Sequence, residues 1–277
     1  MKRFPIAALL FEFLVVSAGF TIAQAAEDPD LVYLHVSAID RERGRPVRGI
    51  AEENFKILEG DKLQKIVSLS QEEVPLAVGI LIDAHGEMKP TIKKGVDALT
   101  RSLGRQDQIF VAEAGDNRLN DAVLQNLQKV LQLTNKRRAL VLVTDRTDPS
   151  GYVFTKVKEL LRMEDIQLYS IAILKSEGPL PNSSADIFRD LAELSGGNTY
   201  VPFSAVEVSD ITKKIAAELK NQYVIGYRPA NQANDGKWRK IKITAQFIDD
   251  KQKIQKPIVR AKSGYYPPLG TAASAKN

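Results

Sequence analysis

Acidic and basic side chains gather at two points of the sequence where an apolar run stops. The first run covers residues 76–82 and ends in Asp83-Ala84-His85-Gly86-Glu87, and the second covers residues 139–143 and ends in Thr144-Asp145-Arg146. Carboxylate oxygens bind hard cations such as magnesium, whereas a guanidinium pairs with a carboxylate without any metal ion. These residues point to a polar site at the ends of two strands, in which either a cation or an arginine neutralises the carboxylates.

The apolar runs that precede these side chains are unbroken, which is typical of strands covered on both faces of a parallel sheet. Further apolar segments at residues 109–112, 167–173 and 199–201 alternate with helical patterns. This alternation predicts an α/β unit with a mainly parallel sheet of about five strands flanked by helices. Open sheets of this kind bind ligands beyond the carboxyl ends of their strands, which is where Asp83 and Asp145 would lie.

Both ends of the chain are rich in short strand patterns. Residues 31–39 alternate between apolar and polar side chains, and the C-terminal end contains similar short segments such as residues 238–247. The economical arrangement is a small β-sandwich formed by residues 31–73 and 222–266, with the α/β unit (residues 74–221) inserted between them. The alternative is that the flanking strands extend or cap the central sheet.

The N-terminal segment has the features of an export signal. A basic start is followed by an apolar stretch and by Ala23-Gln24-Ala25, which has the small-x-small pattern of a cleavage site. We therefore expect residues 1–25 to be a signal peptide that directs the chain to the periplasm or out of the cell; a retained membrane anchor is the alternative. No second segment is apolar enough to span a membrane. Residues 267–277 are expected to form a disordered tail.

Composition removes several kinds of chemistry. The 277-residue chain has no cysteine and only two histidines, which rules out thiolate chemistry and limits histidine-based catalysis. The net charge is +5, and the charged residues are scattered along the chain. No known nucleic-acid-binding motif is present, so a nucleic-acid partner is not expected. It also lacks the nucleophile-elbow, phosphate-loop and His-Glu-x-x-His motifs. We therefore expect no enzyme activity. His35 is expected to be an ordinary surface residue.

The first strand end resembles the von Willebrand factor type A domain, in which an apolar strand runs into Asp-x-Ser-x-Ser. The closer similarity is to secreted bacterial proteins related to this domain, and it covers roughly residues 31–265. It includes Thr144-Asp145, Ser195-Gly196-Gly197 and Gln222-Tyr223-Val224-Ile225-Gly226-Tyr227. The resemblance implies a Rossmann-like fold and a magnesium ion held by one aspartate and two hydroxyls, with help from a threonine and a second aspartate.

Compared with this family, the chain has the two aspartates at the strand ends but lacks the two serine hydroxyls. Asp83 matches the first aspartate and Asp145 the second, but His85 and Glu87 stand where the serines are expected, and Arg146 replaces a glycine. One interpretation is a degenerate site without a cofactor, in which Arg146 or Lys89 neutralises the carboxylates. The alternative is an altered site in which Asp83, Glu87 and Asp145, with His85, hold a divalent cation such as magnesium, manganese or zinc.

The chain is also shorter than the family pattern in one place. Only residues 113–118 separate the second strand from the next helix, which is too little for the edge strand and helix that the family places there. The family's threonine loop has no counterpart in this region, which contains Asp116. We therefore expect the sheet edge near Ile109 to be uncovered.

These observations predict an exported binding module that contacts a protein partner through the strand-end face. A structural or assembly component of the cell envelope, self-associating through the edge near Ile109, is the alternative. A metal-dependent hydrolase is less favoured, because no nucleophile or general base is arranged beside the carboxylates. The candidate binding residues are Asp83, His85, Glu87, Asp116, Asp145 and Arg146.

Overall fold

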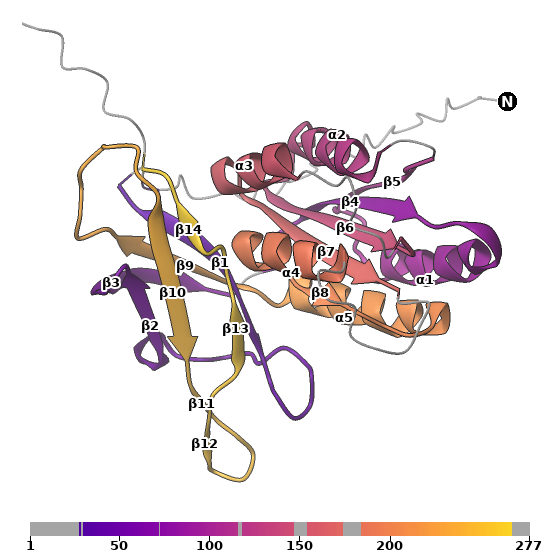
Figure 1. The fold of residues 1–277 in the computed structure, drawn as a ribbon. Coiled ribbons are helices and arrows are strands. Elements are labelled where there is room, and N and C mark those ends of the chain that lie inside the picture. Colours follow the sequence, from indigo (N-terminus) through magenta and orange to yellow (C-terminus); the bar gives the residue numbers. More distant parts are fainter. Residues whose placement is uncertain are drawn as a thin grey trace, which may run out of the picture.

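The fold consists of an α/β unit and an antiparallel β-sheet, which lie side by side in space (Figure 1). The computed structural model describes residues 28–267 except positions 29, 72, 116–117, 147–153 and 174–183. The expected signal peptide, residues 1–25, and the expected tail beyond Pro267 lie outside the described residues. Within the described part of the chain, no helix combines the length and the apolar character needed to cross a membrane.

Five parallel strands form the sheet of the α/β unit in the order β5-β4-β6-β7-β8. All eight residues of β4 are buried, which explains its continuous apolar sequence up to Asp83. The predicted five-stranded parallel sheet is confirmed, and β5 is an edge strand, as the short connection after it requires. The strands are β4 (Leu76–Asp83), β5 (Gln108–Glu113), β6 (Arg137–Thr144), β7 (Ile166–Ala172) and β8 (Thr199–Tyr200).

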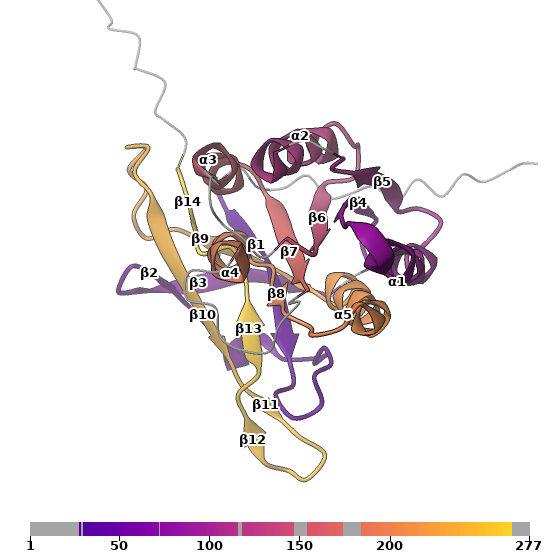
Figure 2. The same ribbon diagram turned by 45° about the vertical axis from the view of Figure 1, so that its right-hand side comes forward.

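Helices cover both faces of this sheet (Figure 2). On one face α1 (Lys89–Ser102) and α5 (Val208–Lys220) pack against alternate residues of β4, including Val78 and Ile80. On the other face lie α2 (Leu119–Leu131), α3 (Thr155–Met163) and α4 (Ser184–Ser195). The apolar stripes of these helices bury one side each and leave their charged residues outside. The described residues also contain three short 3₁₀ helices: η1 (Glu52–Asn54), η2 (Gly86–Met88) and η3 (Ala205–Glu207).

The antiparallel sheet draws its seven strands from both ends of the chain, in the order β13-β1-β9-β3-β2-β10-β14. C-terminal β9 lies between N-terminal β1 and β3, and β10 pairs with β2, so neither end can complete the sheet alone. The strands are β1 (Val32–Ile39), β2 (Phe55–Glu59), β3 (Lys62–Ser70), β9 (Tyr223–Arg228), β10 (Arg239–Ala245), β13 (Ile258–Arg260) and β14 (Gly264–Tyr265). A separate hairpin consists of β11 (Phe247–Ile248) and β12 (Ile254–Gln255).

This second unit differs from the expected sandwich in one respect. A sandwich consists of two sheets packed face to face, whereas here a single sheet surrounds one apolar core that includes Val36, Ile57 and Ile225. The two outermost strands, β13 and β14, are separated by only residues 261–263, so the edges of the sheet are brought back toward each other. The sequence shows which segments are strands but does not show whether they divide into two sheets.

Polar contacts join the two units. The buried Nε2 of Gln222, just before β9, donates to Oε1 of Gln167 on β7 at 2.8 Å and to Oγ of Ser37 on β1 at 3.0 Å. At the same junction Nδ1 of His35 lies 3.0 Å from Oδ2 of Asp165. His35 was expected to be an ordinary surface residue and not a partner in the strand-end site. Its pairing with Asp165 corrects the first part, because this face of β1 is turned toward the α/β unit, whereas Asp165 is not a residue of the strand-end site.

Candidate functional site

The candidate site lies where the strand order of the parallel sheet reverses. From β4 the chain passes through α1 to β5 on one side, and then through α2 to β6 on the other side of β4. Open α/β sheets bind ligands at such a topological switch point. Asp83, the last residue of β4, is in register with Thr144, the last residue of β6. Asp145 and Arg146 follow directly, so the two clusters of polar side chains meet.

Asp83 is at the bottom of the site and is only 1% exposed. Its Oδ2 accepts a hydrogen bond from Thr144 Oγ1 at 2.7 Å, and its Oδ1 lies 2.8 Å from Arg146 Nη2. The contact with Arg146 is an ion pair without the alignment of a hydrogen bond. Burial raises the pKa of Asp83 above its ordinary value, while the hydrogen bond from Thr144 and the charge of Arg146 act in the opposite direction.

Asp145 is also only 1% exposed, and both of its carboxylate oxygens contact His85. Its Oδ1 lies 3.0 Å from Nδ1 of His85, and its Oδ2 accepts a hydrogen bond from the backbone N–H of His85 at 3.2 Å. The backbone N–H of Asp145 donates in turn to the carbonyl of Asp83 at 3.1 Å. These contacts fix the imidazole at the rim of the site, where half of the side chain is exposed.

Arg146 connects the buried carboxylates with the rim. Besides Asp83, its Nη2 approaches Nε2 of His85 at 3.4 Å and donates to the carbonyl of Gly115 at 3.3 Å. Its backbone N–H donates to Thr144 Oγ1 at 3.1 Å. The guanidinium is one-quarter exposed and lies between the ends of β4, β5 and β6. It therefore supplies positive charge next to Asp83.

The residues of this site do not fit a magnesium ion. Among the described residues, no group of three or more His, Asp or Glu side chains is arranged to hold a metal. The set Asp83, Glu87 and Asp145 is not gathered, since Glu87 is exposed on η2. The guanidinium of Arg146 faces Asp83, and His85 offers nitrogen, which is a poor ligand for magnesium. This geometry agrees with the interpretation in which Arg146 neutralises Asp83.

Lys89, another residue that the sequence offered for this site, stands apart from it. Lys89 pairs with Oε2 of Glu113 at 2.6 Å, and Lys93 pairs with Oε1 of the same residue at 2.6 Å. These two lysines lower the pKa of Glu113 to about 2. The expectation that Lys89 neutralises a strand-end aspartate was wrong, because Lys89 forms its ion pair with Glu113 at the end of β5. Asp116 lies outside the described residues.

The sequence did not single out the role of Thr144. Its hydroxyl is fully buried, donates to Asp83 and accepts from the backbone of Arg146. The available signal was positional: a hydroxyl residue ending one parallel strand comes next to a carboxylate that ends its neighbour when the two strands are in register. That register is a tertiary property, because β4 and β6 are separated by β5 and two helices in the chain.

Comparisons with known proteins do not place the chain in a family. No known family profile matches it, and no curated protein is similar to it. Among solved structures it is similar to one described as a short-chain flavodoxin associated with a non-canonical PDU bacterial microcompartment. The identity is 15%, the alignment covers 52% of this chain and 96% of that chain, and the TM-score is 0.32. A likeness this distant has no bearing on function.

Proposed function

We propose that this chain is an exported binding protein with an α/β unit of the von Willebrand factor A type, which contacts a protein partner at the strand-end site without a divalent cation. The observation that carries the proposal is the ion pair between Arg146 Nη2 and Asp83 Oδ1, 2.8 Å apart at the switch point of the sheet. Export is supported by the basic and apolar N-terminal pattern ending in Ala23-Gln24-Ala25.

A binding role fits the site better than hydrolysis. His85 and Asp145 have the geometry of a base and the group that orients it, but this arrangement needs a nucleophile within reach. The strand ends do carry the hydroxyl of Thr144, but it is buried and donates to Asp83. Among the described residues the hydrogen-bonding partners of His85 are Asp145 and Arg146, and neither carries a hydroxyl group. The exposed half of His85 and the exposed Glu87 instead form a polar rim.

Calorimetric titration with magnesium and manganese tests the role of Arg146. The unmodified chain is expected to bind neither ion, whereas Arg146→Gly should bind one with micromolar to millimolar affinity, because Asp83 then lacks its guanidinium partner. Lys89→Gly is the matched control and should stay without binding, since Lys89 pairs with Glu113. Tight magnesium binding by the unmodified chain would refute the proposal. Manganese binding that Glu87→Ala abolishes would favour the altered metal site.

Affinity capture from envelope extracts tests the binding function itself. A partner retained by the tagged chain should stay bound in EDTA and bind at least about tenfold more weakly to His85→Ala, because that ring forms the rim of the site. Leu63→Ala changes an exposed residue of the antiparallel sheet and should leave capture unchanged. A partner that EDTA releases would contradict a cation-independent site.

The same experiment separates binding from assembly, the second candidate function. Assembly is favoured by one observation: β5 is an open edge strand, and its Val111 is 49% exposed. A tagged chain that retains untagged copies of itself, and loses them on Val111→Lys, would support assembly in place of partner binding.

A further inference from the structure

The outer face of the antiparallel sheet carries lysines on three neighbouring strands, β2, β3 and β10. Alternate side chains of these strands face the apolar core, among them Ile57, Ile66 and Ile241. The residues between them therefore point to the opposite side of the sheet. This outward set contains four exposed lysines, which we name the lysine face: Lys56, Lys65, Lys240 and Lys242.

Strand register brings the four lysines close together. Lys242 of β10 lies opposite Leu58 of β2, and Leu58 lies opposite Leu63 of β3. Each of the other three lysines is two residues along a strand from one of these positions, so its side chain is on the same face. Neighbouring strands are about 4.8 Å apart, so the lysines come from a strip of sheet roughly 10 Å wide.

The lysine face is not neutralised by acidic side chains. The ion pairs and hydrogen bonds of the described residues include none of its four ammonium groups. Glu59 is the one acidic residue of the three strands, and it is buried and paired with Arg239. The turn between β2 and β3 adds an exposed carboxylate, Asp61. The face therefore keeps a net positive charge.

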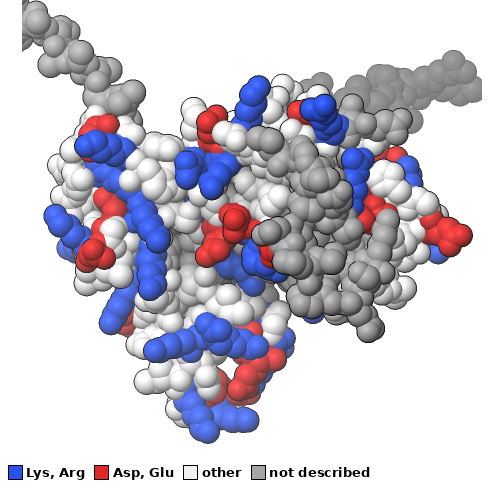
Figure 3. Space-filling model, in the orientation of Figure 1, with Lys and Arg blue, Asp and Glu red and all other residues white. Residues whose placement is uncertain are grey.

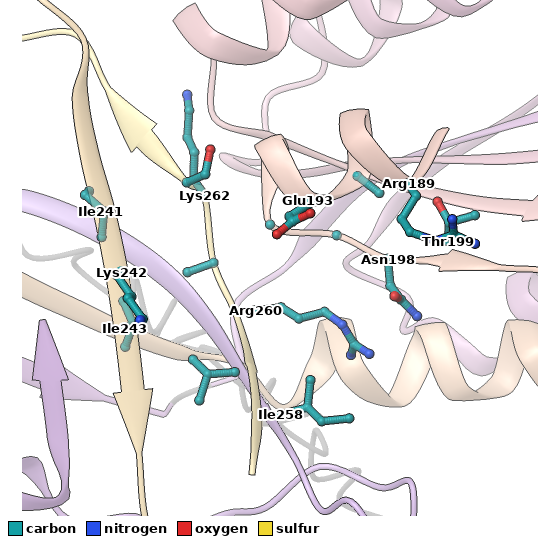
Figure 4. Close-up of a pocket in the computed structure, with 16 residues that line it drawn as sticks. Arg189, Glu193, Asn198, Thr199, Ile241, Lys242, Ile243, Ile258, Arg260 and Lys262 are labelled. Carbon is teal, nitrogen blue, oxygen red and sulfur yellow. The ribbon is translucent and has the colours of Figure 1, made fainter. Parts of the chain in front are cut away.

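The basic residues of the neighbouring cleft differ, because they have partners. This cleft of about 410 Å³ lies between β10 and the segment that carries Ile258 and Arg260 (Figure 4). Arg260 pairs with Glu218 at 3.0 Å, and Lys262 donates to the carbonyl of Glu164 at 2.7 Å. Of these two surfaces, the lysine face is thus the one with positive charge to offer a ligand. Lysine and arginine gather along the surface over β10 (Figure 3).

The side chains of this face indicate the kind of partner. Lysine ammonium groups are hydrated point charges, which do not select the planar groups that arginine recognises. The three strands, which the structure describes in full, expose no aromatic side chain on which a nucleic-acid base could stack. Leu63, 65% exposed, lies among the lysines. This combination fits an anionic lipid bilayer, where charge is spread over a plane and apolar side chains enter the interface.

We propose that the lysine face binds the surface of an anionic lipid bilayer. Its ammonium groups lie over the phosphate groups of the lipids, and Leu63 enters the headgroup region between them. Binding is electrostatic and reversible, because one apolar side chain cannot anchor a protein. The lysine face belongs to the antiparallel sheet and acts independently of the strand-end site around Asp83, so each can fail without the other.

Sedimentation with lipid vesicles measures this binding. The full chain should bind vesicles of equal parts phosphatidylglycerol and phosphatidylcholine, and not vesicles of phosphatidylcholine alone. Replacing the four lysines of the face by glutamine should weaken binding at least about tenfold, because each lysine adds to the attraction. Replacing four exposed lysines on helices of the α/β unit changes the net charge equally and should weaken binding less than about threefold. The control variant combines Lys94→Gln, Lys156→Gln, Lys158→Gln and Lys214→Gln.

The same measurement distinguishes a bilayer from other anions. Soluble glycerol phosphate at the phosphate concentration of the vesicles should not release the chain, because binding needs a surface that meets several lysines at once. Release by glycerol phosphate, equal losses in the two fourfold variants, or equal binding to neutral vesicles would overturn the proposal. So would binding of polyglutamate without binding of anionic vesicles, since an acidic protein would then be the partner.

A fluorescent label tests which face meets the membrane. The chain has no cysteine, so Leu63→Cys supplies a single thiol for an environment-sensitive dye. Its emission should shift to shorter wavelength on anionic vesicles, as the dye leaves water. Val206→Cys is the matched control, at a side chain that is 73% exposed on η3 of the α/β unit, and it should show no shift. His85→Ala should leave vesicle binding unchanged. Equal shifts at the two labelled positions would overturn the proposal.

Discussion

Arg239→Met is expected to lower the free energy of unfolding by about 3 kcal/mol, the lower end of the range for breaking a buried ion pair. Nη1 of Arg239 lies 3.4 Å from Oε1 of Glu59, and both side chains are only 7% exposed. Glu59 also accepts hydrogen bonds from Tyr227 at 2.9 Å and Tyr265 at 3.0 Å. Removing the guanidinium leaves the carboxylate with these two hydroxyls alone, and urea unfolding measures the loss.

The matched control is the same substitution in an exposed ion pair. Nη2 of Arg43 lies 2.6 Å from Oδ2 of Asp250, but the two side chains are 40% and 63% exposed. Arg43→Met should therefore leave the free energy of unfolding nearly unchanged, because an exposed ion pair contributes little. Adding Glu59→Gln to Arg239→Met should recover part of the loss, because no buried charge then remains unpaired. If Arg239→Met and Arg43→Met lower the free energy of unfolding equally, burial does not determine how strongly the pair between Glu59 and Arg239 stabilises the fold.

The Glu59–Arg239 pair also connects the two ends of the chain, because Glu59 ends β2 and Arg239 begins β10. Loss of this ion pair should destabilise β2, from the N-terminal part of the chain, together with β10, from the C-terminal part. The antiparallel sheet needs both segments, since β9 lies between β1 and β3.

Gly197→Ala is expected to cost about 3 kcal/mol or more, because the added methyl group has no room. A Cβ at this position would lie 2.0 Å from the carbonyl oxygen of Leu168 and 2.6 Å from its carbonyl carbon. Both are backbone atoms of β7, so no side chain can move aside. The turn is also fixed by its own hydrogen bond, from the N–H of Gly197 to the carbonyl of Ala192 at 2.9 Å.

Gly104→Ala is the control for a glycine-to-alanine substitution that causes no steric clash. A Cβ there would meet its nearest atom, Oδ2 of Asp107, at 3.5 Å, which is ordinary contact, and the residue has no positive φ. This variant should be neutral or slightly stabilising, by up to about 1 kcal/mol, because alanine restricts the unfolded chain. Thermal and urea unfolding of both variants would test the comparison. A Gly197→Ala variant as stable as Gly104→Ala would mean that α4 and β7 can move apart at little cost.

Much of the α/β unit could be predicted from the sequence. A continuous apolar run must be buried on both faces, so residues 76–82 indicated the central strand of a parallel sheet. The brevity of residues 113–118 excluded a further edge strand, and β5 is indeed at the edge. The positions of Asp83 and Asp145 at strand ends followed from the same patterns, since parallel strands end at a common side of the sheet.

The tertiary structure decided which polar groups pair. The sequence offered both Arg146 and Lys89 as candidates to neutralise the carboxylates. In the structure Arg146 pairs with Asp83 and Lys89 pairs with Glu113. It also placed Thr144 against Asp83 and His35 against Asp165. These pairs depend on strand register and side-chain direction between segments far apart in the chain, which local patterns do not specify.

The tertiary structure likewise decided the form of the second unit. Alternating patterns identified strands at both ends of the chain, but a strand has the same local pattern in a sandwich and in a single wrapped sheet. What distinguishes the two forms is which strand edges pair, and here β13 pairs with β1 at one edge of the sheet and β14 with β10 at the other. The sequence by itself determined the strands and the strand-end charges. The tertiary structure alone decided how these strands join, because the pairing of β13 with β1 and of β14 with β10 depends on the register between segments far apart in the chain.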